Sequence, residues 1–430
     1  MLKQKKLAII LASSLFLAGC GFIAPSALQG SDDAAIEGMG SMPLGLNDEP
    51  TEEIHVPRRA LIGPNPWQEN SSAALSVGPQ ENVALLKDLI DGAKKTLFIE
   101  VFNFANDSMG QQMMPHVVAA AKRGVKVYFL CDYVGSKFVG GAKLGAEMAK
   151  AGVEFRMYAP RFIRQDDQRR GINITHRKLY LADGDRGLTG GVNLMSEFDT
   201  TTQDILVDFR GFQAAQLHAE FVRDWKLAKG KNLQYEPIKT DQQYGTVRTQ
   251  TLVTSPPEGR FEAKIAAYQA IETAQREILI EQQYLCDQGL MDRLYDAAKR
   301  GVSVRVIVPG KSGSGLFKNL HTIALNALIK AGGQARLYHS GTDGNAHVHT
   351  KYFGVDDKWA MFGSLNADTR ALIDNQELNV ATTDQTLIRA LRTRLFEPDW
   401  QHSSVTYEFS DSDWYKAPFI KLWQIVNYYV

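Results

Sequence analysis

The sequence is poor in three things: cysteine, an excess of charge of one sign, and long hydrophobic runs. Only Cys20, Cys131 and Cys286 occur in 430 residues, which excludes a disulfide-rich scaffold, and their spacing fits no zinc-site pattern. Lysine plus arginine and aspartate plus glutamate both total 48, which argues against the broad positive field of a nucleic-acid-binding protein. We therefore expect no structural metal and no nucleic-acid partner, whereas pairing of Cys131 with Cys286 stays open.

Membrane-spanning segments are also missing, because no run of 18 apolar residues follows the amino terminus. The first 20 residues form a targeting signal, in which an apolar stretch from Leu7 to Phe16 is followed by the box Leu17-Ala18-Gly19-Cys20. This box resembles a bacterial lipoprotein signal, which implies that Cys20 is acylated and attaches the mature chain to a membrane. An ordinary signal peptide with an incidental cysteine is the alternative.

Residues 21–65 are rich in small and acidic residues and show no periodicity, which predicts a flexible tether. Gly21 lacks the aspartate that, by resemblance to lipoprotein sorting, would retain the protein at the inner membrane. In a Gram-negative cell we expect a periplasm-facing lipoprotein, at the outer membrane rather than the inner one.

The rest of the chain repeats itself with a period of roughly 175 residues, which indicates domain duplication and is far too long for a solenoid. Leu97–Val101 matches Ile278–Gln282, and Ala121–Tyr128 matches Ala298–Arg305. Each half reads as strand, helix, strand, helix, strand, which predicts an α/β fold with a largely parallel sheet. The first predicted half spans residues 66–235 and the second spans residues 236–430.

After its third strand each half reaches the string H-x-K-x-x-x-x-D, which supplies His176, Lys178 and Asp183, and then His349, Lys351 and Asp356. Both strings read as strands. Because alternate residues of a strand face the same way, each histidine shares a face with its lysine. An imidazole and an ammonium group therefore converge on one pocket.

Other residues recur at fixed offsets from each histidine. A glycine falls at +14, an asparagine at +17 and a carboxylate at +28, namely Gly190 and Gly363, Asn193 and Asn366, Asp204 and Glu377. A single histidine on a strand is more often structural than catalytic, but a site repeated at matching offsets reverses that expectation. The sequence therefore predicts two half-sites, each with a histidine, a lysine, an asparagine and a distant carboxylate.

These residue types suit transfer at a phosphodiester, which needs a nucleophile, a proton donor for the leaving alcohol, and cations with amide donors around the phosphate oxygens. Asp204 and Glu377 are the predicted partners that fix the tautomers of the histidine rings. Asp183 and Asp356 stand at strand ends, where a carboxylate often binds turn backbone, so we expect a structural role for them. His347 could face a metal with His349, but Lys351 on the same face would repel a cation.

The paired motifs resemble those of the phospholipase D superfamily, and the resemblance extends from about Leu75 to the region of Trp400. Local details resemble the bacterial cardiolipin synthases, in the segments 132–136, 308–312 and 363–377. The resemblance implies two duplicated α/β halves with mixed sheets, packed by pseudo-twofold symmetry around one shared active site. It also implies a covalent phosphohistidine and no metal or other cofactor.

By the same resemblance His176 is the expected nucleophile and His349 the general acid and base, with Asn193, Asn366 and Ser364 facing the phosphate. The first half lacks a counterpart of Ser364. We expect a phosphatidyltransferase that joins two phosphatidylglycerols and releases glycerol; the alternative is a hydrolytic phospholipase D acting on phospholipid head groups. A nuclease is disfavoured by the neutral charge and the lipid attachment, and an inactive scaffold by the completeness of both motifs.

Two further segments have functional interpretations. Residues 311–318, rich in glycine and serine, predict a mobile loop over the pocket. The aromatic tail 414–430 predicts either an interfacial segment that helps to present lipid or a terminal helix packed on the second half. Many cardiolipin synthases begin with two transmembrane helices, and this chain departs from them in having a lipoprotein box instead.

Overall fold

The computed structural model describes residues 53–56, 65–165, 170–231, 233–234, 236–310, 324–338 and 347–403. The predicted signal with Cys20, most of the tether, the loop 311–318 and the tail 414–430 lie outside the described residues. Within these described ranges, no helix combines the length and the apolar character that a bilayer crossing requires.

Each half is built on one large sheet, and the two sheets have the same strand order. The first sheet has seven strands in the order β2-β11-β9-β8-β3-β4-β5. These are β2 (Ser71–Val77), β11 (Ile205–Gly211), β9 (Arg186–Gly190), β8 (Leu179–Ala182), β3 (Thr96–Val101), β4 (Lys126–Asp132) and β5 (Glu154–Tyr158).

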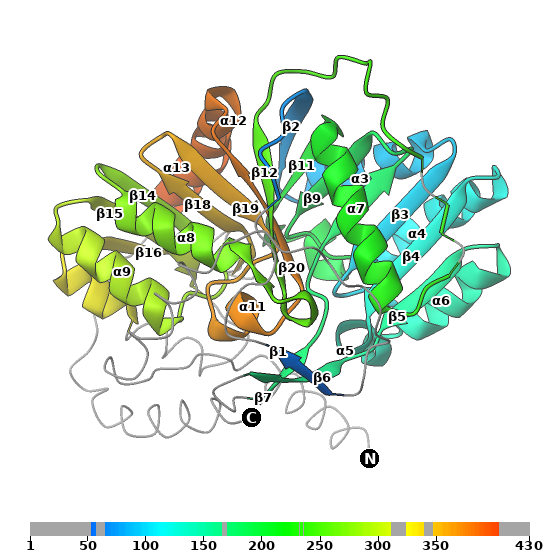
Figure 1. The fold of residues 1–430 in the computed structure, drawn as a ribbon, viewed down its shortest axis with the longest axis horizontal. Helices are drawn as coiled ribbons and strands as arrows, with labels where there is room; N and C mark the ends of the chain where they lie inside the picture. The colour runs from blue at the N-terminus through cyan, green and yellow to red at the C-terminus, as the bar shows by residue number, and fades with distance from the viewer. Residues whose placement is uncertain are drawn as a thin grey trace.

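The second sheet repeats this order as β12-β20-β19-β18-β14-β15-β16 and adds β13 (Arg260–Phe261) at the edge next to β12. Its strands are β12 (Thr249–Ser255), β20 (Glu377–Thr382), β19 (Trp359–Gly363), β18 (Lys351–Val355), β14 (Glu277–Gln282), β15 (Ser303–Pro309) and β16 (Gln334–Tyr338). The repeat detected in the sequence is therefore a repeat of topology. Figure 1 shows the two sheets side by side, with β11, β9, β12 and β20 near the middle of the molecule.

The sheets are mixed, so the prediction of a largely parallel sheet was wrong. Within the two large sheets, parallel pairing is limited to β3 with β4 and β4 with β5, and to the matching strands β14, β15 and β16. The remaining strands pair antiparallel. The reason is that the chain turns back after each motif in a short hairpin, β8–β9 and β18–β19, whose antiparallel strands need no helical crossover.

Helices join the parallel strands and cover the sheets. In the first half these are α3 (Pro79–Gly92), α4 (Ser108–Lys122), α6 (Gly141–Lys150) and α7 (Phe212–Leu227); the second half has α8 (Glu262–Thr273), α9 (Gln288–Lys299), α11 (Thr369–Ile373), α12 (Gln385–Ala390) and α13 (Glu397–His402), with the π-helical turn η4 (Leu391–Phe396) between the last two. The helices α4 and α9 begin alike, because Asp107 and Asp287 each accept a backbone N–H of the first turn.

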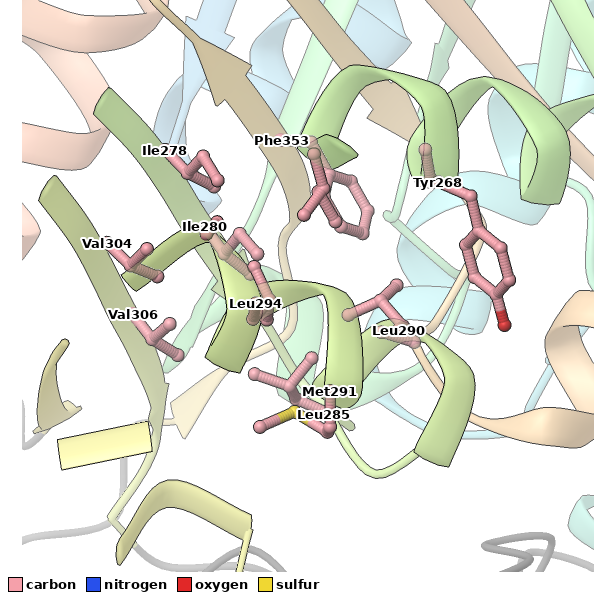
Figure 2. Close-up of a cluster of buried hydrophobic side chains, with 14 of the residues drawn as sticks. Tyr268, Ile278, Ile280, Leu285, Leu290, Met291, Leu294, Val304, Val306 and Phe353 are labelled. Carbon is pink, nitrogen blue, oxygen red and sulfur yellow. The ribbon is translucent and has the colours of Figure 1, made fainter. Parts of the chain in front are cut away.

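Three hydrophobic cores hold these layers together. One lies in the first half, between its sheet and α3, α4 and α6. Another lies in the second half and contains Tyr268, Leu290 and Leu294 of the helices together with Ile278 and Ile280 of β14 (Figure 2). The third is central and takes side chains from both halves. The two repeats thus share one core, which fixes how they meet.

Short strands also pair segments that lie far apart in the sequence. The two-residue strand β10 (Thr202–Gln203) of the first half pairs in parallel with β17 (His347–Val348) of the second. A separate small sheet consists of β1 (Glu53–Val56), β6 (Arg161–Gln165) and β7 (Arg170–Asn173). The strand β7 leads directly into the first motif.

Candidate active site

The two motif histidines lie just before strands rather than within them. His176 lies in an extended segment between β7 and β8, and His349 lies between β17 and β18, so the prediction that both motifs are continuous strands holds only from Leu179 and Lys351 onward. Both rings are almost completely buried, with 8% of His176 and 6% of His349 exposed. Burial of a polar ring requires hydrogen-bonding partners, and each ring has them.

His176 is held by groups of the second half. Its Nδ1 lies 3.0 Å from Oε1 of Glu377 and 3.1 Å from the backbone oxygen of Ser364. The ring of Phe102 packs edge-on against it, with the centroids 5.1 Å apart. A carboxylate at Nδ1 favours the tautomer that carries a proton there, so chemistry would fall to Nε2.

His349 is held by groups of the first half in the same manner. Its Nδ1 lies 2.7 Å from Oδ2 of Asp204. The ring of Phe198 packs edge-on against it at 4.9 Å, as Phe102 packs on His176. Both imidazoles therefore have a carboxylate of the opposite half at Nδ1 and an edge-on phenylalanine of the first half, but Nδ1 of His349 also lies 2.8 Å from Nζ of Lys351.

The carboxylates are exchanged between the repeats, an assignment that the predicted pair of half-sites left open. Each histidine binds the carboxylate of the other repeat, because the backbone immediately before that carboxylate pairs with the histidine segment. The N–H of His176 donates to the oxygen of Gln376 at 2.9 Å, and the N–H of His349 donates to the oxygen of Gln203 at 2.9 Å. One interleaved site results, and neither half contains it alone.

The motif lysines lie beside these histidines, completely buried or nearly so. Each Nζ donates to the backbone oxygen of its own histidine, Lys178 to His176 and Lys351 to His349. Burial lowers the pKa of Lys178 to about 8, although Glu377 and Asp204 act in the opposite direction. Burial also holds the pKa of Lys351 well below its usual value, and the charge of Lys178 lowers it further. A phosphodiester bound between the two ammonium groups would supply an anion that favours the charged form of both.

Burial also shifts the pKa values of His176 and of Asp204, the carboxylate that contacts His349. It lowers the pKa of His176 to about 4, with Glu377 opposing the shift and Lys178 adding to it, so the ring is neutral at neutral pH. Burial raises the pKa of Asp204 to about 6, against the lowering effect of Lys351. A neutral His176 is in the state that a nucleophile needs.

The serine and glycine positions next to the carboxylates explain a difference between the halves. Ser364 is buried; its hydroxyl donates to Oε2 of Glu377 and accepts the N–H of Leu378. At the corresponding Gly191, an added Cβ would lie 2.3 Å from Oδ2 of Asp204. The shorter aspartate thus requires glycine beside it. The contacts of Ser364 are those of a residue that positions Glu377, and its role at the phosphate stays a prediction.

The two asparagines at +17 are also buried. Oδ1 of Asn193 accepts the backbone N–H of Asn103 at 3.1 Å, which fixes that amide. Oδ1 of Asn366 has no hydrogen-bond partner among the described residues. Both follow the strand that carries the +14 glycine, so the offsets place them at the same end of matching strands.

The motif aspartates lie away from the histidines, in hairpin turns. Asp183 and Asp356 have φ values of 54° and 57°, in the left-handed region that aspartate tolerates. Asp183 accepts the backbone N–H groups of residues 94–96, and Asp356 accepts those of residues 275–277. These bonds fasten each hairpin to the strand β3 or β14, which is the structural position assigned to them from sequence.

The sequence analysis missed two buried carboxyl pairs beneath the site. Glu100 of β3 faces Asp224 of α7, and Glu281 of β14 faces Asp399 of α13. Burial raises the pKa of all four groups, so each pair can share a proton. Glu100 also accepts the hydroxyl of Thr175 at 2.6 Å, next to His176. A signal existed, because each glutamate is the fifth residue of its strand, β3 or β14, and each aspartate precedes a tryptophan.

Two other predictions concern thiols and metals. Cys131 is a buried free thiol, so it does not pair with Cys286. Across the described ranges, no group of three or more histidine, cysteine, aspartate or glutamate side chains has the arrangement of a metal site. The side chain of His347 lies outside the described residues.

A duplicated α/β fold that joins two histidine–carboxylate pairs and two lysines in one site defines a phosphodiester transferase of the phospholipase D superfamily. The sequence matches the family described as "Cardiolipin synthase, PLD-like domain" over residues 86–225 and 268–400. These matches cover more than half of the chain, which therefore belongs to this family.

Individual relatives agree with this assignment. The chain is 28% identical to the major cardiolipin synthase ClsA of Bacillus subtilis over 352 residues, 79% of this chain and 71% of that protein. It is 26% identical to cardiolipin synthase A of Pseudomonas entomophila over 359 residues, 81% of this chain and 73% of that protein. The structure of a phosphatidylserine synthase from Haemophilus influenzae matches the fold with a TM-score of 0.65 and 14% identity, covering 85% of this chain and 97% of that one.

Proposed function

We propose that this enzyme is a phosphatidyltransferase of the cardiolipin synthase type, which joins two phosphatidylglycerols and releases glycerol. The observation that carries the proposal is the interleaved pair of histidines, each with its Nδ1 at a carboxylate of the other repeat. Two imidazoles with separate carboxylates can hold different proton states in one site, as a two-step transfer requires. The names of the cardiolipin synthases that the chain resembles support the choice of lipid.

In the first step, Nε2 of neutral His176 attacks the phosphorus of phosphatidylglycerol. The bond from phosphorus to the glycerol oxygen breaks, and protonated His349 gives its proton to that oxygen. In the second step, a hydroxyl of another phosphatidylglycerol gives its proton to His349 and its oxygen attacks the phosphorus. The bond between phosphorus and His176 breaks, and cardiolipin leaves with both rings restored.

The lysines and carboxylates of the site stabilise the charges that develop on the phosphate and on the imidazoles. Lys178 and Lys351 offset the negative charge that grows on the phosphate oxygens during each attack. Asp204 stabilises His349 when that ring is charged, and Glu377 stabilises His176. Acylation of Cys20 would keep the enzyme at the membrane that holds its substrate, and we propose a periplasm-facing position, at the outer membrane of a Gram-negative cell.

The test is product analysis by mass spectrometry after the purified protein is incubated with phosphatidylglycerol vesicles. We expect cardiolipin and glycerol in equal amounts, and loss of both in His176→Ala and in His349→Ala. Formation of phosphatidic acid without cardiolipin would instead identify a hydrolytic phospholipase D. Full activity in either alanine variant would refute the two-histidine mechanism.

A further inference from the structure

The described surface exposes large hydrophobic side chains at one place in the fold. Across the residues that the structure describes, such side chains are Phe138, Val139 and Phe162, with 68% of Phe138 and 65% of Phe162 exposed. We call these residues the apolar rim. Exposed aromatic groups of this size carry a cost in water that an apolar partner would remove.

The apolar rim lies at the same edge of the sheet as the catalytic histidines. Phe138 and Val139 belong to the 3₁₀ turn η1 (Lys137–Val139), which follows β4 through the short helix α5 (Tyr133–Ser136), and Phe162 follows β5 on β6. The strands β4 and β5 are parallel neighbours, so both segments leave the sheet at the same end. The strand β3, which is parallel to β4, ends beside Phe102, whose ring contacts His176. Figure 1 shows α5 and β6 along this edge of the first half.

Hydrogen bonds connect the turn that carries the rim to the catalytic segment. Oδ1 of Asp132 accepts the N–H groups of Val134 and Gly135, and its Oδ2 accepts the N–H of Thr175, the residue before His176. The hydroxyl of Ser136 donates to the oxygen of Phe102 and accepts the N–H of Phe104. These bonds involve the segment 132–136 that resembles cardiolipin synthases. The turn that carries Phe138 and Val139 is therefore connected to the segment that carries His176.

The exposed charge next to Phe138 and Val139 is positive. Residues 133–146 include the exposed Lys137 and Lys143 and no carboxylate. Exposed aromatic groups beside cations are complementary to an anionic lipid surface, in which apolar acyl chains lie beneath negatively charged headgroups.

We propose that the apolar rim inserts among the acyl chains of an anionic lipid surface while Lys137 and Lys143 contact its headgroups. Asp132 and Ser136 then fix the depth of His176 relative to the phosphates in that surface. The inference rests on the proposed function, because it supplies the surface from which the active site would take its lipid.

The first test compares two substrates. The rate on phosphatidylglycerol vesicles is divided by the rate on short-chain phosphatidylglycerol below its micelle concentration. We expect this ratio to fall roughly tenfold in Phe138→Ser/Phe162→Ser, because two apolar side chains no longer enter the interface. The ratio should also fall in Lys137→Glu/Lys143→Glu, less so in high salt. The matched control is Lys122→Glu/Lys126→Glu, at the opposite end of β4. An unchanged ratio in both rim variants would overturn the inference.

The second test needs no catalysis, so it separates failure of this inference from failure of the proposed function. In a His176→Ala background, Phe138→Trp should be quenched by phosphatidylglycerol vesicles with brominated acyl chains. Lys126→Trp serves as the control at the opposite edge, and the native tryptophans contribute equally to both proteins. Equal quenching of the two variants would contradict insertion of the rim, whereas extra quenching of Phe138→Trp supports it even if the lipid product proves different.

Discussion

Each catalytic imidazole depends on a residue that lies about 150 to 200 positions away in the chain, Asp204 for His349 and Glu377 for His176. A carboxylate on one ring nitrogen stabilises the charged imidazole and sets which nitrogen reacts. Because Asp204 is buried with Gly191 pressed against it, the carboxylate has little freedom to move. The charge of each ring is therefore controlled from the opposite repeat.

This exchange predicts how single substitutions should group. Asp204→Asn should resemble His349→Ala, and Glu377→Gln should resemble His176→Ala, with kcat lowered roughly 10²–10⁴-fold in the two amide variants. A p-nitrophenyl phosphodiester, whose leaving group needs no proton, allows the steps to be separated by intact-protein mass spectrometry. Phosphohistidine should accumulate in His349→Ala and Asp204→Asn, and should not form appreciably in His176→Ala and Glu377→Gln. Grouping of Asp204→Asn with His176→Ala would contradict the exchange.

The lowered pKa of Lys178, about 8, predicts an alkaline limit to activity. Its ammonium group is charged below that pH and is lost as the pH rises through it, so kcat/KM for the phosphodiester should fall there. The measurement is the pH profile of kcat/KM for the wild type and for Lys178→Arg. The arginine stays charged, so its profile, although lower throughout, should extend to higher pH. If the alkaline fall of kcat/KM stays at the same pH in Lys178→Arg, that fall belongs to another group, such as Lys351.

At the scale of elements, the segment between β7 and β8 is braced by a buried network of charges. Nη1 of Arg177 lies 2.7 Å from Oδ2 of Asp224 and 3.3 Å from Oε2 of Glu220, both on α7. Arg260 of β13 binds Glu220 at 2.9 Å and Glu262 of α8 at 2.7 Å. The network thus joins the first motif to elements of the second half.

Removal of one member of this network should be costly, because it leaves buried carboxylates without their cation. We expect Arg177→Ala to lower the free energy of unfolding by about 3–5 kcal/mol, measured by urea denaturation. The control is Arg223→Ala, whose side chain is 29% exposed and pairs with Glu258 at 3.2 Å, and which should cost less than about 1 kcal/mol. Similar losses in the two variants would show that burial of the network does not matter.

The elements also show what the sequence can and cannot reveal. The repeat, the order of three strands and two helices, and the matching offsets all follow from local pattern. The hairpin after the first motif was also readable, because Asp183-Gly184 is a strong hairpin signal that the parallel-sheet prediction overlooked. The exchange of Asp204 and Glu377 was not readable, since offsets counted along the chain do not say which repeat a side chain enters.

At the scale of the whole molecule, the two halves share their central core. The third hydrophobic cluster contains Phe98, Phe209 and Phe221 of the first half together with Leu279, Phe362 and Phe396 of the second. The rings of Phe209 and Phe362 stack across the junction with centroids 6.2 Å apart. The helix α7 packs on β9 and β11 of its own half and also on β12 of the other. Neither half buries its inner surface alone.

The shared core predicts that the halves unfold together, although each has a complete sheet. Phe362→Ala removes a fully buried ring at the junction and should cost about 3–5 kcal/mol. If the core couples the halves, this cost lowers amide protection in β3 of the first half as much as in β14 of the second, and hydrogen exchange read by mass spectrometry compares the two. Loss of protection in β14 alone, or two separate transitions on heating, would mean that the halves are independent domains that meet only at the active site.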